Sequence, residues 1–155
     1  MRLAAAGASR AVMRKLSAHG VKLVMPSLLE GLGATQWRTK QASIRMLGAT
    51  AFCAPKQLGA CLPQVVPQLL NAHSDTHPKV RAAALTALNN VGGVVRNPEV
   101  SAISNELLAA LTDPIGKTSA ALDVLASTSF VHAVDPPSLA LLMPVLRRGL
   151  TASSA

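Results

Sequence analysis

Aromatic residues are almost absent from this 155-residue sequence, which has one Trp, two Phe and no Tyr. Half of its residues are nevertheless hydrophobic, so the core has to be built from Leu, Val, Ile, Met and Ala. Sandwiches and barrels rely on β-branched and aromatic residues, whereas small aliphatic side chains suit close packing between helices. Strand-like alternation of apolar and polar residues is also missing at any length. The composition therefore predicts an all-α fold.

Acidic residues are scarce in the first part of the chain. Residues 1–60 contain nine Lys or Arg and one acid, Glu30, whereas residues 61–155 contain six of each sign. The net charge of +8 is therefore carried entirely by the first part. A basic surface attracts nucleic acid, an anionic membrane or an acidic protein segment, but it is also compatible with a merely solvated helix face.

Signals for disulfides and membrane insertion are missing as well. Two cysteines, Cys53 and Cys61, have no Cys-x-x-Cys spacing, so we interpret them as small buried hydrophobic residues in a reducing cytosol. No apolar run reaches the roughly 18 residues that span a membrane. Residues 1–24 contain five Lys or Arg and no acid, which is also the composition of a mitochondrial transit peptide. A mitochondrial location therefore stays open as the minor alternative.

The sequence repeats itself at intervals of about forty residues. Segments that begin at Leu28 and Leu69 align without a gap at an offset of 41, and a third copy begins 38 residues later at Leu107. Each copy predicts a first helix, a polar turn and an Ala-rich second helix. Prolines recur in register inside the first helices, at Pro26, Pro67 and Pro144. Because an internal proline removes one helical hydrogen bond, the prolines predict a shared bend.

The second copy has the residue types and spacing of the HEAT repeat, at Pro67, Asp75, Val80 and Arg81. In that family, the acidic and the basic residue form a ladder between adjacent repeats. The other copies keep the ladder only in part, because Lys40 supplies the base in the first copy and Asp113 supplies the acid in the third. We therefore interpret Lys40 and Arg81 as structural residues of the stack.

The resemblance implies an α-solenoid of HEAT-type helix pairs, with about three to four repeats of 37–41 residues. We expect tails at 1–7 and 151–155 and an array over 8–150. The array is divided into the second helix of a partial repeat at 8–19, full repeats at 21–54, 60–96 and 98–133, and a partial repeat at 136–150. Neither end resembles a polar cap. We therefore interpret the chain as a window of a longer array, with flanking repeats as neighbours.

A closer resemblance covers the chain from about Ala8 to Leu150. It is carried by strings such as WRTKQASIRMLGATAFCAPKQL, DTHPKVRAAALTAL and DPPSLALLMPVLRRGL. They resemble the central region of the large general-control translational activators, which are themselves similar here to fungal translation elongation factor 3. This resemblance implies a long HEAT solenoid that binds ribosomes, notably stalled ones, and works with an ATP-binding-cassette partner protein. The implied location is cytoplasmic, cytosolic and polysome-associated.

The same resemblance implies a role in activating the kinase that phosphorylates initiation factor 2 alpha. The family's kinase-contacting segment lies downstream of the matched region, so the link to the kinase is indirect. The ATPase cassettes of elongation factor 3 lie outside the matched region too. Our hypothesis is a non-enzymatic scaffold that acts in amino-acid starvation and ribosome stalling. The alternative is a generic HEAT adaptor for protein–protein interaction outside translation.

No residue set supports catalysis, a metal or a cofactor. His73 and His77 are four apart, but they straddle a turn at Asp75 and no third ligand is near in sequence, whereas zinc needs three or four protein ligands. Glycine-rich phosphate-binding motifs are missing. We therefore predict no enzyme activity and no bound cofactor.

The best candidate binding residues are basic. They begin successive second helices or follow two turns later, and they are Arg38, Arg45, Lys79 and Lys117. If the helices stack regularly, these residues form a stripe along one face that can bind ribosomal RNA phosphates or an acidic protein segment. Trp37 has two interpretations, either a packing residue at the seam between repeats or an exposed anchor for a partner.

Overall fold

The structure, a computed structural model, describes residues 11, 15 and 17–152. This part of the chain is helical and contains no strand. Its helices are α2 (Ala18–Leu32), α3 (Trp37–Cys53), α4 (Pro55–His73), α5 (Pro78–Gly92), α6 (Pro98–Ala102), α7 (Ser104–Thr112), α8 (Pro114–Ser127) and α9 (Pro136–Ala152). The prediction of an all-α helical solenoid is confirmed. None of these helices is long and apolar enough to cross a bilayer.

Helix starts follow local capping chemistry. Helix α2 begins after Ser17, whose hydroxyl accepts a hydrogen bond from the Gly20 amide at 3.2 Å. The partial-repeat helix expected at 8–19 lies mostly outside the described residues, and its last two positions belong to α2 instead. Helices α4, α5, α6 and α8 each begin with proline, which suits the first helical position because the missing N–H has no partner there. Helix α9 ends at Ala152, within the segment expected as a tail.

The recurring prolines lie inside helices, with Pro26 in α2, Pro67 in α4 and Pro144 in α9. The third unit differs, because its first helix is split into α6 and α7 at Ile103. Asn97 caps the short piece by accepting a hydrogen bond from the Val100 amide at 3.0 Å. The break changes how the rest of the chain stacks.

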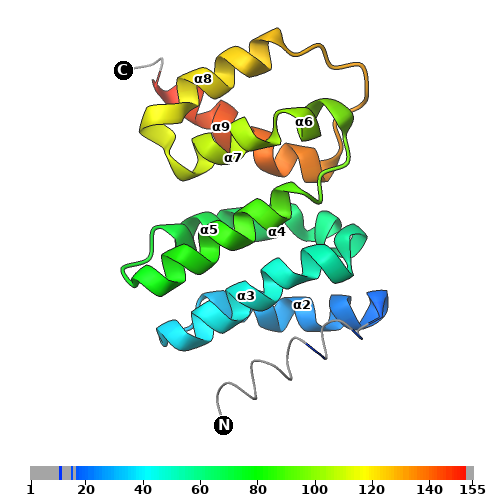
Figure 1. Cartoon of the computed structure of the whole chain (residues 1–155), viewed down its shortest axis with the longest axis vertical. Coiled ribbons are helices and arrows are strands. Elements are labelled where there is room, and N and C mark those ends of the chain that lie inside the picture. Colours follow the sequence, from blue (N-terminus) through cyan, green and yellow to red (C-terminus); the bar gives the residue numbers. More distant parts are fainter. Residues whose placement is uncertain (1–10, 12–14, 16, 153–155) are drawn as a thin grey trace.

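The first two helix pairs stack in regular order. Helices α3 and α5 lie side by side in one row, and α2 and α4 form a second row behind them (Figure 1). The core between the rows is aliphatic, and Leu47, Leu69 and Leu88 are fully buried. This packing agrees with the helix pairs expected from the repeat and places the equivalent ends of α3 and α5 next to each other.

The third pair does not continue these rows. Helix α5 packs against α7, α4 packs against α9, and α8 makes its main contacts with α7 and α9 (Figure 1). Residues 128–135 lead from α8 to the start of α9 and are held against α6. The Asn97 side chain donates to the Ala133 carbonyl at 3.2 Å, and the Glu99 carboxylate accepts from the amides of Val131 and His132. The expectation of one regular row of second helices is therefore wrong beyond α5.

Candidate functional site

Helices α3 and α5 present a strongly basic face. They contain no acidic residue and five basic ones, Arg38, Lys40, Arg45, Lys79 and Arg81. Because the two helices are adjacent and parallel in the stack, their charges add along one surface. Some of these residues are engaged within the protein, and the others remain available for a ligand.

Lys40 is engaged in a contact between repeats. Its ammonium lies 2.7 Å from the Asp75 carboxylate, and the exposed fractions of the two side chains are 26% and 12%. The hydrogen bond from Lys40, followed by the one from the His77 amide, lowers the pKa of Asp75 below its usual value. The structure thus contains the ladder contact between the first and second units.

Arg81 holds the turn that precedes its own helix. Its guanidinium donates to the carbonyl oxygens of Asp75 and Thr76, both at 2.9 Å. The next residue toward the helix start, Val80, is fully buried. Arg81 therefore donates two hydrogen bonds to the turn, although its side chain remains exposed.

Trp37 joins the starts of α3 and α5. Its ring stacks on the ring of His77, with centroids 4.0 Å apart and planes 11° apart. The Arg38 guanidinium lies 4.6 Å and the Lys79 ammonium 5.4 Å from the centre of the same ring. Cations are attracted to the face of an indole. Trp37 is half-buried and brings two basic residues together at the seam.

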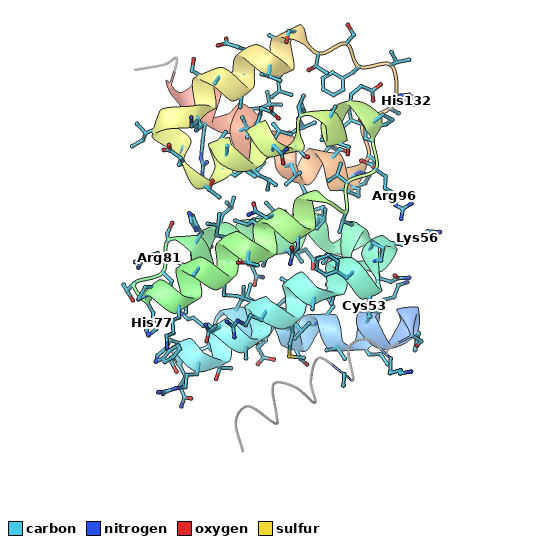
Figure 2. All side chains as sticks on the ribbon, in the orientation of Figure 1. Cys53, Lys56, His77, Arg81, Arg96 and His132 are labelled. Carbon is cyan, nitrogen blue, oxygen red and sulfur yellow. The ribbon has the colours of Figure 1, made fainter. Side chains whose placement is uncertain are left out.

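His77 was not recognised in the sequence as part of this cluster. Its Nδ1 accepts the Lys79 amide at 3.2 Å, so it caps α5 while its ring faces Trp37. Figure 2 shows His77 and Arg81 at the same end of α5. The available signal was the position of His77 before Pro78, which corresponds at the 41-residue offset to Gln36 before Trp37.

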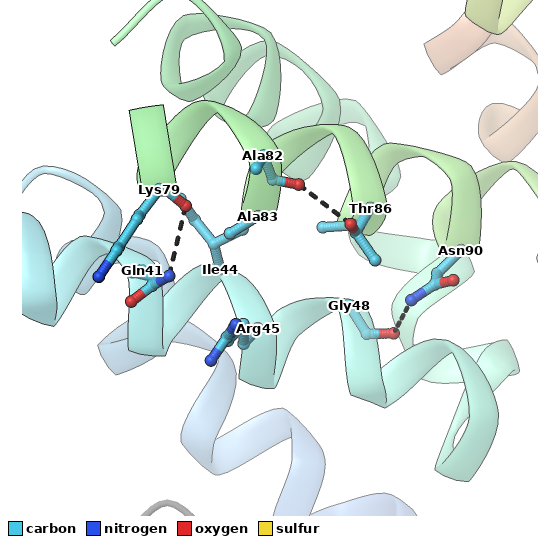
Figure 3. Close-up of a pocket in the computed structure, with 10 residues that line it drawn as sticks. Gln41, Ile44, Arg45, Gly48, Lys79, Ala82, Ala83, Thr86 and Asn90 are labelled. Carbon is cyan, nitrogen blue, oxygen red and sulfur yellow. Dashed lines mark hydrogen bonds between the residues drawn. The ribbon is translucent and has the colours of Figure 1, made fainter. Parts of the chain in front are cut away.

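A cleft of about 500 Å³ lies between α3 and α5. Arg45 and Lys79 line it together with Gln41 and Asn90 (Figure 3). The Gln41 amide donates to the Lys79 carbonyl and the Asn90 amide donates to the Gly48 carbonyl, both at 3.4 Å. These two bonds tie the helices together on either side of the cleft. Arg45 and Lys79 remain exposed at its border.

Close approach of the two helices depends on Gly48. A Cβ atom at this position would lie 3.1 Å from Cα and 3.2 Å from Cβ of Ala87, which is tighter than ordinary van der Waals contact. The missing side chain therefore lets α3 and α5 pack closely. It also keeps the basic residues of both helices along one narrow surface.

Lys117 does not belong to this surface. It is exposed on α8, and α8 packs on α7 and α9, whereas the neighbour of α5 is α7. The predicted four-residue stripe is therefore corrected to Arg38, Arg45 and Lys79, which we call the basic row. Asp113, expected as a ladder acid, caps α8 by accepting the Gly116 amide at 3.1 Å.

The histidines and cysteines considered in the sequence add no further candidate site among the described residues. Among the described residues, no group of three His, Cys, Asp or Glu side chains is placed to hold a metal ion. Cys53 and Cys61 are free thiols at the edge of the core and are half-buried, where full burial was expected. The α3–α5 face therefore combines positive charge with side-chain amides that form hydrogen bonds.

Comparisons with known proteins agree with this architecture. A family profile described as "EF3 N-terminal HEAT repeat" matches residues 1–88, and one described as "Elongation factor 3/GNC1 HEAT repeat" matches residues 117–155. No solved structure matches the chain.

Three relatives cover nearly the whole chain. The chain is 55% identical over 161 residues to "Protein ILITYHIA" of Arabidopsis thaliana and 54% identical over 148 residues to "Stalled ribosome sensor GCN1" of Homo sapiens. It is 41% identical over 155 residues to "eIF-2-alpha kinase activator GCN1" of Saccharomyces cerevisiae. These alignments include 96–100% of the chain but span only 6% of the length of each relative.

Proposed function

This chain belongs to the family of EF3 N-terminal HEAT repeats, and from that premise we propose that it is a non-enzymatic scaffold that associates with the ribosome. The proposal includes a role in promoting phosphorylation of initiation factor 2 alpha when ribosomes stall or amino acids are scarce. Two relatives, named a stalled ribosome sensor and an eIF-2-alpha kinase activator, support this direction. The corresponding location is the cytoplasm, on ribosomes and polysomes.

The observation that carries the proposal is the basic row. Arg38, Arg45 and Lys79 are exposed on two adjacent helices that contain no acid. A surface of this kind binds phosphates by releasing the counterions of the nucleic acid, and the affinity then falls steeply with salt. Ribosomal RNA is the phosphate-rich surface that a ribosome-associated scaffold meets.

The mode of contact follows from the scarcity of aromatic residues. Sequence-tolerant binding of single strands usually uses aromatic side chains on which bases stack. Here Trp37 already stacks on His77, and Phe52 and Phe130 are the only other aromatic residues of the chain. We therefore propose contacts to the RNA backbone that are electrostatic and independent of sequence.

The scaffold role rests on the same geometry. The polar side chains of the cleft are an arginine, a lysine, two amides and a threonine, and none is a carboxylate or a thiol. We assign this face to binding. Contact with an ATP-binding-cassette partner protein and an indirect link to the kinase belong to the proposal as well, because the family resemblance of the sequence implies both.

Co-sedimentation with purified ribosomes tests the proposal. The wild-type chain is compared with Arg38→Glu/Arg45→Glu/Lys79→Glu across a salt series from about 50 to about 300 mM, because each lost phosphate contact flattens the salt dependence. We expect strong loss of pelleting at low salt and a smaller difference at high salt, where screening already weakens the wild type.

A matched control reverses three exposed bases elsewhere, Lys56, Arg96 and Lys117. Figure 2 shows Lys56 and Arg96 at the edge of the molecule away from His77 and Arg81. Both triple variants change the net charge equally, and circular dichroism checks that both remain helical. Equal pelleting of all three proteins at every salt concentration would show that the basic row is only a solvated face.

A further inference from the structure

Helices α4 and α9 form a second groove, of about 680 Å³. No residue of α3 or α5 lines it, so it is separate from the basic row. Its apolar lining comes from two sides, with Pro63, Pro67 and Leu70 on α4 and Leu139, Met143 and Pro144 on α9. The volume lies within the range of about 300–1,000 Å³ that is typical of ligand sites.

The α9 side of the groove exposes large hydrophobic side chains. Leu139 is 42% and Met143 45% exposed, and both line the groove. Their spacing of four residues places them on one side of the helix. A contiguous apolar surface rimmed by polar groups is typical of a site that binds another protein. Methionine adapts its shape to different partners.

Two of the prolines that line the groove interrupt the regular hydrogen bonding of their helices. Pro67 and Pro144 have no N–H, so the carbonyls of Pro63 and Ala140 lack the donor that would follow four residues later in a regular helix. Both Pro63 and Ala140 line the groove.

Charge defines the kind of partner. No acidic residue lines the groove, whereas Arg147 and Arg148 do. Arg148 donates to the carbonyls of Ala110 and Leu111 at 3.2 and 3.5 Å. Arg147 is exposed, and among the described residues no carboxylate pairs with its guanidinium. A second copy of this chain is a poor occupant, because two molecules of net charge +8 repel each other.

We propose that the α4–α9 groove binds a short amphipathic segment of an acidic partner protein. Apolar side chains of the segment cover Met143, Leu139 and the prolines, and a carboxylate of the segment pairs with Arg147. Binding of a helix through apolar residues spaced three and four apart is a recurrent mode of peptide recognition. This site is independent of ribosome association, which the basic row carries.

The probe is a fluorescein-labelled synthetic peptide of about twelve residues, with Leu at helical spacing and Glu between. Anisotropy measures its binding to the full chain, and the methyl resonance of Met143 reports where it binds. Met25, which is buried, and Met46, which is half-buried, lie outside the groove and serve as internal references. We expect the Met143 methyl to shift and the references to stay unchanged.

Two controls separate shape from charge. A peptide with Ser in place of Leu should not bind, and Arg147→Glu should weaken binding of the Leu–Glu peptide by about tenfold or more. Arg147→Gln provides a milder variant if the reversal disturbs folding. Arg96→Glu lowers the net charge as much as Arg147→Glu does, but Arg96 is exposed outside both the groove and the basic row, so this variant should leave the affinity for the peptide nearly unchanged.

Three results would overturn the proposal. The first is binding without any shift of Met143, and the second is an equal loss of affinity in Arg96→Glu and Arg147→Glu. The third is a concentration-dependent shift of Met143 without peptide, which would assign the groove to a second copy of the chain. None of these results affects ribosome co-sedimentation, so failure here and failure of the proposed function are distinguishable.

Discussion

The junction between the first two repeats and the junction that follows it are built differently. At the first, α3 and α5 run side by side, Gly48 lets them approach closely, and the Lys40–Asp75 ion pair links the repeats. At the second, α7 takes the place beside α5, and α9 takes the place beside α4. A regular junction aligns equivalent residues, and an irregular one separates them.

Burial of the second helices shows the same contrast. Helix α5 buries seven residues, whereas α8 buries only Ala121. Ile115, near the start of α8, is fully exposed. A repeated basic residue therefore contributes to a shared surface only where its helix packs into the row formed by α3 and α5. This explains why Lys79 belongs to the basic row and Lys117 does not.

The largest effect should come from removing core volume at the regular junction. Leu88 of α5 is fully buried, so Leu88→Ala should cost about 2–5 kcal/mol, from lost transfer energy and the cavity left behind. Leu125 of α8 is only half-buried, and Leu125→Ala should cost clearly less. Urea unfolding of both variants measures the difference. Equal costs would mean that the two junctions are packed equally well.

The ladder ion pair should have an intermediate effect. Asp75→Ala removes the acceptor of Lys40 and of the His77 amide, and a loss on the order of 1–3 kcal/mol is expected for such a partly buried group. Arg81→Ala, which removes two bonds to the turn, should also destabilise the fold. Asp123→Ala on exposed α8 is the matched control and should change stability by less than about 0.5 kcal/mol. Unchanged melting of Asp75→Ala together with lost ribosome binding would assign Asp75 to function instead.

Acid pH should weaken the same pair. The pKa of Asp75 is lowered in the folded protein, so its contribution is fully present above the unfolded value of about 3.9 and is lost as pH falls through the folded pKa. Wild type should therefore lose more stability than Asp75→Ala between about pH 5 and pH 3. Thermal melting of both proteins across this range makes the comparison. Parallel curves would show that Asp75 is not linked to folding.

Much of the fold could be predicted from the sequence, because the signals are local. Proline at the first helical position marks the start of α5 at Pro78 and of α8 at Pro114, and the 41-residue offset pairs α3 with α5. The turn at Asp75 was recognised for the same reason, whereas Asp113 was expected as a ladder acid and instead caps α8. Such local chemistry acts within each repeat and does not depend on how the neighbouring repeats pack.

The irregular junction could not be predicted, because it depends on contacts between distant segments. Helix α6 ends before Ile103, Asn97 donates to residues 128–135 and Glu99 accepts from them, and together these features place α9 beside α4. The shorter offset of the third copy, 38 residues instead of 41, was the only hint in the sequence. The Trp37–His77 stack was missed for a similar reason, since the tilt between two helices decides which rings meet.

The smallest effect concerns the segment that leads to α9. The hydrogen bond from His132, with the Val131 amide, lowers the pKa of Glu99 from 4.5 to about 2. The contact should therefore be complete above pH 4.5 and be lost as pH falls through about 2. Amide resonances of Val131 and His132 followed against pH should show this midpoint, and Glu99→Gln should abolish the transition. A midpoint near 4.5 would show that the segment is not held by Glu99.

We propose that the regular junction between α3 and α5, and not basic charge in general, forms the surface that contacts the ribosome. Lys79→Glu and Lys117→Glu test it most directly, because both sit at the start of a second helix, both are exposed and both change the net charge equally. Pelleting of the full chain with ribosomes is measured at about 50 mM salt, where phosphate contacts contribute most. We expect Lys79→Glu to weaken binding to ribosomes several-fold and Lys117→Glu to leave it unchanged. Equal loss of binding in both variants would show that the junction does not define the surface.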